Sequence, residues 1–265
     1  GDRRVAIGAL AKELRLPPGE IVAGLDDAGF YRPRQVAITV PESDLIERGA
    51  DLAALAEWVK GPVPAFVVYG SRGMGKTALA RAFAGGARRP ATWVDVAPDD
   101  PGILRGDLAS SMRNLGGSGS PEAVERDVAD LKPLIVLDGY GEVSEGVVDT
   151  VSSLLAAVAG SPGAKLLVLA AEATPSYCRF YGAVEVRKGT VREIRLKGLS
   201  PDGTRKLLGN SAIGAEALRQ VYLLTKGCPL YLTLIRDGDP ARLREVSRFT
   251  PAEIRLLMFS RAAPR

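Results

Sequence analysis

Eight consecutive residues carry the strongest chemical signal in the sequence. Residues 70–77 read Gly-Ser-Arg-Gly-Met-Gly-Lys-Thr, which fits the phosphate-binding pattern G-x-x-x-x-G-K-[ST]. In such a loop the glycines let backbone N–H groups converge on an anion, and the start of the following helix adds its positive dipole. Lys76 would reach the β- and γ-phosphates, and the Thr77 hydroxyl would ligate Mg²⁺. The spacing therefore predicts a site for a nucleoside triphosphate and its magnesium ion.

The segments on either side of this loop strengthen the prediction. An apolar run at 65–69 precedes the loop and predicts a strand, and a helix-compatible stretch at 76–85 follows it. A glycine-rich turn that matches the pattern by accident is the alternative interpretation. That alternative requires the strand, the loop and the helix to coincide by chance, so we favour the phosphate site.

A second acidic position follows a buried strand. Residues 134–137 read Leu-Ile-Val-Leu, and Asp138 comes directly after them. A carboxylate at the carboxyl end of such a strand holds Mg²⁺ through its water shell in phosphate-loop enzymes. A turn residue before Gly139 is the alternative, which we disfavour because charged residues rarely end a buried strand without a partner. We therefore predict that Thr77 and Asp138 hold the metal and that Lys76 and Asp138 are catalytic residues.

Hydrolysis also needs a carboxylate that orients the attacking water. The residue after Asp138 is Gly139, which cannot do this. Glu142 and Glu145 follow closely, and we take Glu142 as the candidate water activator. Both acids could equally be solvated surface residues. The sequence therefore indicates nucleotide binding more firmly than hydrolysis.

The composition excludes several kinds of chemistry. The chain of 265 residues contains no histidine, which removes Ser-His-Asp triads and most zinc sites. Cys178 and Cys228 are too few for a disulfide framework and lack metal-ligand spacing, so we expect reduced thiols. No apolar run approaches the ~18 residues of a membrane span, and the first residues lack an apolar region. We therefore expect a cytoplasmic protein with no membrane contact.

The charge is unevenly distributed along the chain. The formal net charge is +4, but residues 197–265 hold twelve Lys and Arg against six Asp and Glu. A polyanionic partner such as double-stranded DNA would explain this basic C-terminal part. A solvated basic face is the alternative, and charge alone does not separate the two.

The apolar runs predict an α/β domain followed by helices. Short apolar strands that alternate with helices indicate a parallel sheet covered on both faces. The expected strands lie at 65–69, 92–96, 134–137, 166–169 and 194–196, with helices near 76–85, 121–130 and 145–159. After residue 199 we expect only helices, near 201–209, 214–225, 229–236, 240–247 and 251–259. We expect Ser120 and Ser144 to be N-caps.

The first forty residues form a separate predicted unit. Two short helices are expected on either side of Leu16-Pro17-Pro18-Gly19, and residues 31–40 alternate like an exposed strand. Helix, turn, helix and strand resemble part of a winged helix, although many small helical pairs would look the same. We therefore divide the chain into a winged-helix-like unit at 1–43, an α/β domain at 44–199 and a helical lid domain at 200–265.

At this point a family resemblance is visible. Residues 45 to about 259 resemble the archaeal-type P-loop ATPases of the STAND and AAA+ assemblage, which are related to origin-recognition initiators. Four pieces carry the resemblance: the segment Leu45–Leu55, the phosphate loop, the strand that ends at Asp138, and Thr225–Leu232, which is similar to the family's T-G-G-x-P-x-Y-L lid motif. The last piece is the most specific to the family.

The resemblance implies an architecture and a set of binding residues. It implies a P-loop NTPase fold with a parallel sheet in the order 5-1-4-3-2 and a helical lid that closes over the nucleotide near Gly227 and Pro229. The ligands would be ATP or ADP with Mg²⁺. The implied nucleotide-binding residues are Leu45, Ile46 and Arg48 at the adenine, Gly70, Ser71, Arg72, Gly73, Met74, Gly75, Lys76, Thr77 and Ala78 at the phosphates, and Pro229 in the lid.

The sequence departs from the family pattern in two places. Gly139 stands where the family has a glutamate, and Ala170-Ala171-Glu172-Ala173-Thr174 stands where it commonly has small polar sensor residues. Glu172 or Thr174 could take the sensor role. Three arginines are candidates for contact with phosphate or a neighbouring subunit, and surface ion pairs are the alternative for all of them: Arg179, Arg187 and Arg192.

The function expected from these features is that of a MgATP-dependent conformational switch. Its output would be the regulation of a DNA-associated process, with nucleotide-dependent self-association as a further expectation. The alternative is a nucleotide-gated DNA- or protein-binding adaptor that does not hydrolyse ATP, which Gly139 favours. A small-molecule kinase is a third option, for which we find no acceptor-site signature.

Overall fold

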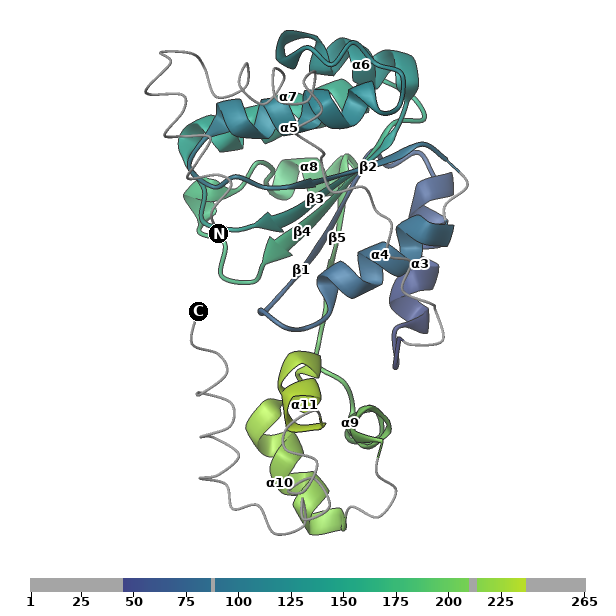
Figure 1. Ribbon diagram of the computed structural model, residues 1–265, viewed down its shortest axis with the longest axis vertical. Coiled ribbons are helices and arrows are strands. Elements are labelled where there is room, and N and C mark those ends of the chain that lie inside the picture. The colour runs from purple at the N-terminus through teal and green to yellow at the C-terminus, as the bar shows by residue number, and fades with distance from the viewer. Residues whose placement is uncertain (1–44, 87–88, 210–213, 237–265) are drawn as a thin grey trace.

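The structure is a computed structural model that describes residues 45–86, 89–209 and 214–236. The expected winged-helix-like unit at 1–43 and the expected helices at 240–247 and 251–259 lie outside these residues. Figure 1 shows these three ranges in colour.

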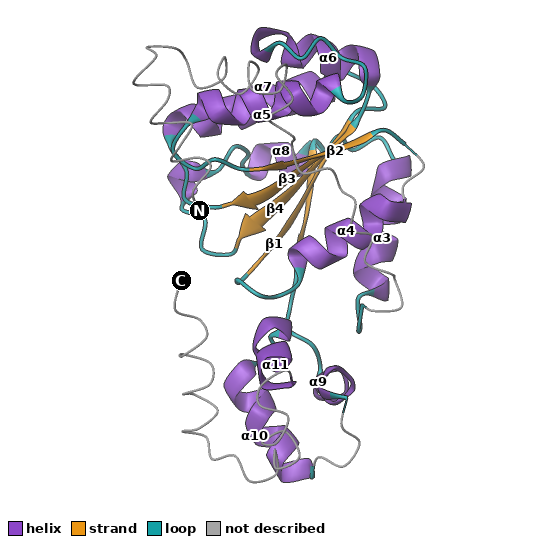
Figure 2. Ribbon diagram, viewed as in Figure 1, coloured by secondary structure: helices purple, strands orange, loops and turns teal. Residues whose placement is uncertain are grey.

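Five parallel strands form one sheet in the order β2-β3-β4-β1-β5. The strands are β1 (Ala65–Gly70), β2 (Ala91–Asp95), β3 (Leu134–Tyr140), β4 (Lys165–Ala171) and β5 (Val191–Arg195). The parallel sheet and the predicted order 5-1-4-3-2 are confirmed. Figure 2 shows the strands side by side, with helices on both sides of the sheet.

The apolar strands are buried because helices cover both faces. On one face, side chains such as Phe66 and Val136 pack with residues of α3 (Gly49–Lys60) and α4 (Lys76–Gly86). The other face packs against α5 (Pro101–Arg113), α6 (Val124–Leu131) and α7 (Glu145–Ala159). The two faces therefore form two apolar clusters separated by the sheet.

Three features of this second layer differ from the sequence prediction. Helix α5 was not predicted, since Gly102 and Gly106 weaken its helical pattern. Its start is nevertheless clear: the Asp100 side chain accepts from the N–H groups of Gly102 and Ile103, and Pro101 follows. The helix expected at 121–130 begins instead with a 3-10 turn, η2 (Pro121–Ala123). Ser120 and Ser144 lie at the predicted cap positions, but neither hydroxyl makes a cap hydrogen bond.

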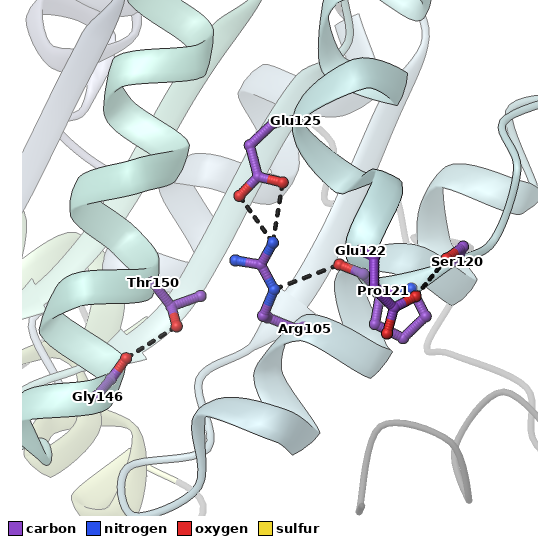
Figure 3. Close-up of polar contacts among 7 residues, drawn as sticks. All are labelled: Arg105, Ser120, Pro121, Glu122, Glu125, Gly146 and Thr150. Carbon is purple, nitrogen blue, oxygen red and sulfur yellow. Dashed lines mark hydrogen bonds and ion pairs between the residues drawn. The ribbon is translucent and has the colours of Figure 1, made fainter.

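Polar contacts join α5 to η2 and to the first turn of α6 (Figure 3). Arg105 donates from Nη2 to both carboxylate oxygens of Glu125, at 2.8 and 2.9 Å, and from Nε to the carbonyl of Pro121 at 3.3 Å. The same view shows Thr150 of α7, whose hydroxyl donates to the Gly146 carbonyl one turn earlier. The Arg105 contacts therefore hold α5 against η2 and α6.

Strand β5 begins three residues earlier than predicted and ends at Arg195. It pairs with β1, and Arg192, Glu193 and Arg195 are exposed along it. An edge strand with charged side chains shows little apolar periodicity, which explains why only its last part was predicted. Two short elements before it were also not predicted: η3 (Ser176–Cys178) and α8 (Ala183–Arg187).

Three helices follow the sheet and have their own apolar cluster. They are α9 (Pro201–Leu208), α10 (Ala215–Thr225) and α11 (Pro229–Arg236), close to the predicted positions. Leu208, Val221 and Leu232 are buried together in this cluster, which lies below the sheet in Figure 1. Across the three described ranges, no helix combines the length and the apolar character that crossing a membrane requires.

Candidate functional site

The phosphate loop at residues 70–77 connects β1 to α4 and depends on its glycines. Gly73 and Gly75 have φ angles of +85° and +89°, in the left-handed region that side chains with a Cβ rarely adopt. A Cβ at Gly70 would lie 2.7 Å from the carbonyl oxygen of Leu196, where the chain passes beyond β5. The loop conformation therefore requires glycine at each of these positions, and Lys76 begins the helix directly after them.

Lys76 folds back over the loop. Its Nζ donates to the carbonyl of Gly70 at 2.6 Å and to that of Ser71 at 3.1 Å. Burial lowers the pKa of this ammonium group, while the charges of Asp138 and Glu172 act in the opposite direction. The cation therefore lies over the mouth of the loop, where an anionic ligand would meet it.

Thr77 and Asp138 meet at the carboxyl end of the sheet although 61 residues separate them in sequence. The Thr77 hydroxyl donates to Asp138 Oδ2 at 2.9 Å. Burial raises the pKa of Asp138, the hydrogen bond from Thr77 lowers it, and the charge of Asp95 raises it. A hydroxyl and a carboxylate are oxygen ligands of the kind that Mg²⁺ prefers, so this pair fits the predicted magnesium site.

Asp95 is an acid of this site that the sequence analysis missed. It ends β2 and aligns with Asp138 in the β2–β3 register. Since side chains alternate along a strand, Asp95 lies on the same face as Trp93, which packs toward α4. A signal was present, because Asp95 is the single charged residue in the strand expected at 92–96.

A third acid lies beside the phosphate loop itself. The Ser71 hydroxyl donates to Glu172 Oε2, and Arg195 forms an ion pair with Oε1 of the same carboxylate. The hydrogen bond from Ser71, and then the charge of Arg195, lower the pKa of Glu172. Of the two predicted sensor candidates, Glu172 contacts the loop, whereas Thr174 donates to the nearby Ala171 carbonyl.

The three arginines proposed from sequence lie elsewhere. Arg192 forms an ion pair with Glu57 at 3.7 Å and lies over the Phe66 ring. This surface ion pair is the alternative role that the sequence analysis gave for this arginine. Arg179 follows η3, and Arg187 lies in the last turn of α8. Arg195, which was not among the candidates, is the arginine that pairs beside the loop.

Glu142, the predicted water activator, lies in the loop after β3. It is exposed and accepts a hydrogen bond from the Tyr177 hydroxyl at 3.3 Å. Glu145 is the first residue of α7. The structure therefore joins Asp138, Thr77 and Lys76 in one place and associates Glu142 with Tyr177.

The residues expected at the adenine lie at the junction between the sheet and the helical cluster. Leu45 packs against the α3–α4 face, and Ile46 packs against the helical cluster. Arg48 is buried, and its Nη2 donates to the carbonyls of Met74 at 3.0 Å and Lys197 at 2.8 Å. Arg48 thus joins the phosphate loop to the segment that leads from β5 into α9.

The start of α11 lies against the phosphate loop. The N–H of Leu230 donates to the Gly73 carbonyl at 3.1 Å, and Cys228 Sγ lies 3.7 Å from the Arg72 carbonyl. Pro229 is the first residue of this helix. The motif at 225–232 and the loop at 70–77 are therefore neighbours in space.

Several solved structures share this architecture. A STAND protein with a tetratricopeptide repeat sensor from Pyrococcus horikoshii is 21% identical over 81% of this chain and 34% of its own, with a TM-score of 0.52. A Walker-type ATPase of Pyrococcus abyssi is 18% identical over 80% of this chain and 74% of its own, with a TM-score of 0.57. Cdc6p from Pyrobaculum aerophilum is 16% identical over 80% of this chain and 66% of its own, with a TM-score of 0.54. The fold is that of the P-loop NTPases.

These similarities concern the fold. No protein-family model matches the sequence, and no curated protein matches it either. The chain spans about a third of the Pyrococcus horikoshii protein and about two thirds of Cdc6p.

Proposed function

We propose that this protein binds MgATP and hydrolyses it to ADP as a conformational switch. One observation carries the proposal. The Thr77 hydroxyl donates a 2.9 Å hydrogen bond to Asp138, and the neighbouring Lys76 lies over the glycine-rich loop at 70–77. Oxygen ligands for Mg²⁺ and a cation for phosphate are thereby placed next to each other, in the P-loop NTPase fold.

Each part of the site has a role in this proposal. The backbone N–H groups of Gly70 through Ala78 and the Lys76 ammonium bind the phosphates, and Thr77 and Asp138 hold the metal. When bound, Mg²⁺ neutralises charge on the phosphates. Leu45, Ile46, Arg48 and Pro229 lie at the junction where the base would enter, and we propose them as its surroundings.

The switch consists of the contacts between the loop and the helical cluster. Leu230 bonds to Gly73, and Arg48 joins Met74 to Lys197. A ligand that changes the loop conformation therefore acts on both contacts, and the helical cluster moves with them. We propose that the output is a DNA-associated process with a nucleotide-dependent homo-oligomer, and the excess of Lys and Arg in residues 197–265 supports this.

A second candidate is an adaptor that binds the nucleotide without cleaving it. Gly139 in place of an acid after Asp138 favours this alternative. In that case nucleotide exchange alone would set the conformation of the helical cluster.

The test is a titration with ATP, with and without Mg²⁺, followed by single-turnover hydrolysis. We expect the native chain to bind MgATP, and Lys76→Ala to weaken binding at least about tenfold because the phosphates lose their cation. Lys60→Ala is the matched control, since Lys60 is exposed at the end of α3. Equal affinity of the native chain and Lys76→Ala would contradict the proposal, and binding without cleavage would select the adaptor.

The DNA-associated part has its own test. Binding to a duplex should weaken as salt rises and should differ between the ATP- and ADP-loaded protein. A duplex affinity that depends neither on salt nor on the bound nucleotide would remove DNA from the proposal and leave the proposed ATP binding unaffected.

A further inference from the structure

The site described so far lacks one component of a hydrolase. Gly139 follows Asp138 with a φ of +84°, and a Cβ built there would have open space around it. The acid that would orient an attacking water is therefore absent from this position. Another residue must orient the water if the protein hydrolyses ATP.

We propose that Glu172 is the carboxylate that orients the attacking water. This inference rests on the proposed ATPase function and names a residue for its chemical step. Glu172 directly follows β4, which lies between the phosphate-loop strand β1 and the Asp138 strand β3. It therefore leaves the sheet between the two parts of the site.

The contacts of Glu172 place it at the mouth of the loop. Its backbone N–H donates to the Gly70 carbonyl at 3.2 Å, and its carboxylate accepts from the Ser71 hydroxyl. Lys76 donates to the carbonyls of these same two loop residues. The carboxylate and the lysine thus meet at one end of the loop, where the lysine of this motif reaches the terminal phosphates.

Asp138 accepts a hydrogen bond from the Thr77 hydroxyl and is the proposed metal ligand, which leaves Glu172 to orient the water.

Glu172 is also held in the ionised form that this role requires. Arg195 pairs with Oε1 and Ser71 donates to Oε2, and both lower the pKa of the carboxyl group. The side chain is 30% exposed, so water reaches it. A carboxylate that is anionic, oriented and wet is suited to accept a hydrogen bond from a nucleophilic water.

The two competing acids are less well placed. Asp95 lies on β2, which is on the far side of β3 from the phosphate loop. Glu142 accepts a hydrogen bond from Tyr177. Glu172, in contrast, bonds to two residues of the phosphate loop, Gly70 and Ser71.

In the proposed step, water displaces ADP from the γ-phosphorus. The water oxygen forms a bond to the γ-phosphorus while the bond from that phosphorus to the β,γ-bridging oxygen breaks, and the bonding electron pair leaves with ADP. Glu172 accepts the proton of the water and then passes it to phosphate or to solvent. The carboxylate is unchanged at the end of the cycle.

The experiment compares Glu172→Gln with Glu142→Gln and Glu193→Gln. Glutamine keeps the size of the side chain and an oxygen that accepts from Ser71, but it cannot take a proton at neutral pH. Glu193 is the matched control because it is an exposed glutamate on the adjoining edge strand that also accepts a hydroxyl, that of Tyr181 at 2.7 Å. ATP affinity, single-turnover hydrolysis and the unfolding midpoint of the nucleotide-free protein are measured for each.

We expect Glu172→Gln to slow hydrolysis at least about 100-fold with ATP affinity changed less than about threefold, the usual scale for a lost general base. Glu193→Gln should leave both unchanged. If Glu172 only stabilised the loop through Ser71, Glu172→Gln would lower the ATP affinity or the unfolding midpoint. The hydrolysis rate would then fall by no larger factor than the affinity. The inference is overturned by that result. It is also overturned if Glu172→Gln hydrolyses ATP at the native rate, or if Glu142→Gln loses hydrolysis and Glu172→Gln does not.

Two outcomes in the native chain separate the inference from the function on which it rests. If the native chain binds MgATP but never cleaves it, Glu172 is not a water-orienting acid, and nucleotide binding stands. If the native chain does not bind ATP at all, the proposed function fails first, and the assignment of Glu172 fails with it.

Discussion

The backbone N–H of Leu230 donates a 3.1 Å hydrogen bond to the carbonyl of Gly73, so helix α11 is attached directly to the phosphate loop. A Cβ at Gly73 would lie only 2.6 Å from the Cβ of Leu230. The closeness of the two segments is therefore possible only because residue 73 has no side chain. The position of α11 depends on the conformation of the loop.

The first prediction uses this contact. Gly73→Ala and Gly75→Ala both place an alanine in the left-handed region, which costs about 1–2 kcal/mol each. Gly73→Ala adds the clash with Leu230, whereas a Cβ at Gly75 meets nothing within 4 Å. We expect Gly73→Ala to lower the free energy of unfolding by about 1 kcal/mol more than Gly75→Ala. Urea denaturation of both variants checks this, and equal losses would mean that α11 adapts at no cost.

The second prediction concerns the metal. In Asp138→Asn the carboxylate that faces Thr77 is replaced by a neutral amide of similar size. We expect the increase in ATP affinity that Mg²⁺ produces to shrink at least several-fold, because the hard cation loses an anionic ligand. Affinity measured in EDTA should stay near that of the native chain. An unchanged response to Mg²⁺ would place the metal elsewhere.

The third prediction is a pH dependence at the start of α9. Glu47 accepts from the hydroxyl and the N–H of Ser200, and these hydrogen bonds lower the pKa of the Glu47 carboxyl below 4.5. A lowered pKa in the folded state means that the stabilisation is present above pH 4.5 and is lost as the pH falls through the folded-state value.

The variant that tests this pH dependence is Glu47→Gln. We expect it to be less stable than the native chain at pH 7, with a difference that shrinks toward pH 3. Denaturant unfolding at several pH values measures the difference, and a gap that is independent of pH would assign it to packing instead of charge.

The fourth prediction concerns a buried lysine far from the loop. Lys165 donates to the carbonyls of Gly61 at 2.7 Å and Val63 at 2.6 Å, and its ammonium lies over the Trp58 ring. Lys165→Met leaves these two carbonyls without the donor, so we expect a loss of about 2 kcal/mol in the free energy of unfolding. Lys188→Met, at an exposed position, should change it by less than about 0.5 kcal/mol. Similar losses in the two variants would show that the buried contacts contribute little.

Much of the fold could be predicted because burial on both faces of the sheet leaves nearly continuous apolar runs. The strands around residues 66, 136 and 168 were found in this way, and their order came from the family resemblance. Helix α5 was missed because Gly102 and Gly106 interrupt its pattern, although Asp100-Pro101 marks its start. The edge strand β5 was found only in part, since its exposed charges hide the period.

The site was predictable where its residues are close in sequence or end a strand. Lys76 and Thr77 belong to one short motif, and Asp138 follows an apolar strand. The link between Glu172 and Arg195 could not be derived in the same way. It joins the residue after β4 to the end of β5 across the phosphate-loop strand, and only the sheet order brings these two residues together.

The position of β1 between β4 and β5 has a consequence for how the chain reaches this structure. Ala65 pairs with Leu166 on one side and with Val191 on the other, so the two partners of the phosphate-loop strand follow it by 101 and 126 residues in the sequence. Pairings of such long range close large loops and slow folding. During synthesis on the ribosome, β1 can therefore pair on both sides only after the chain has emerged as far as residue 195.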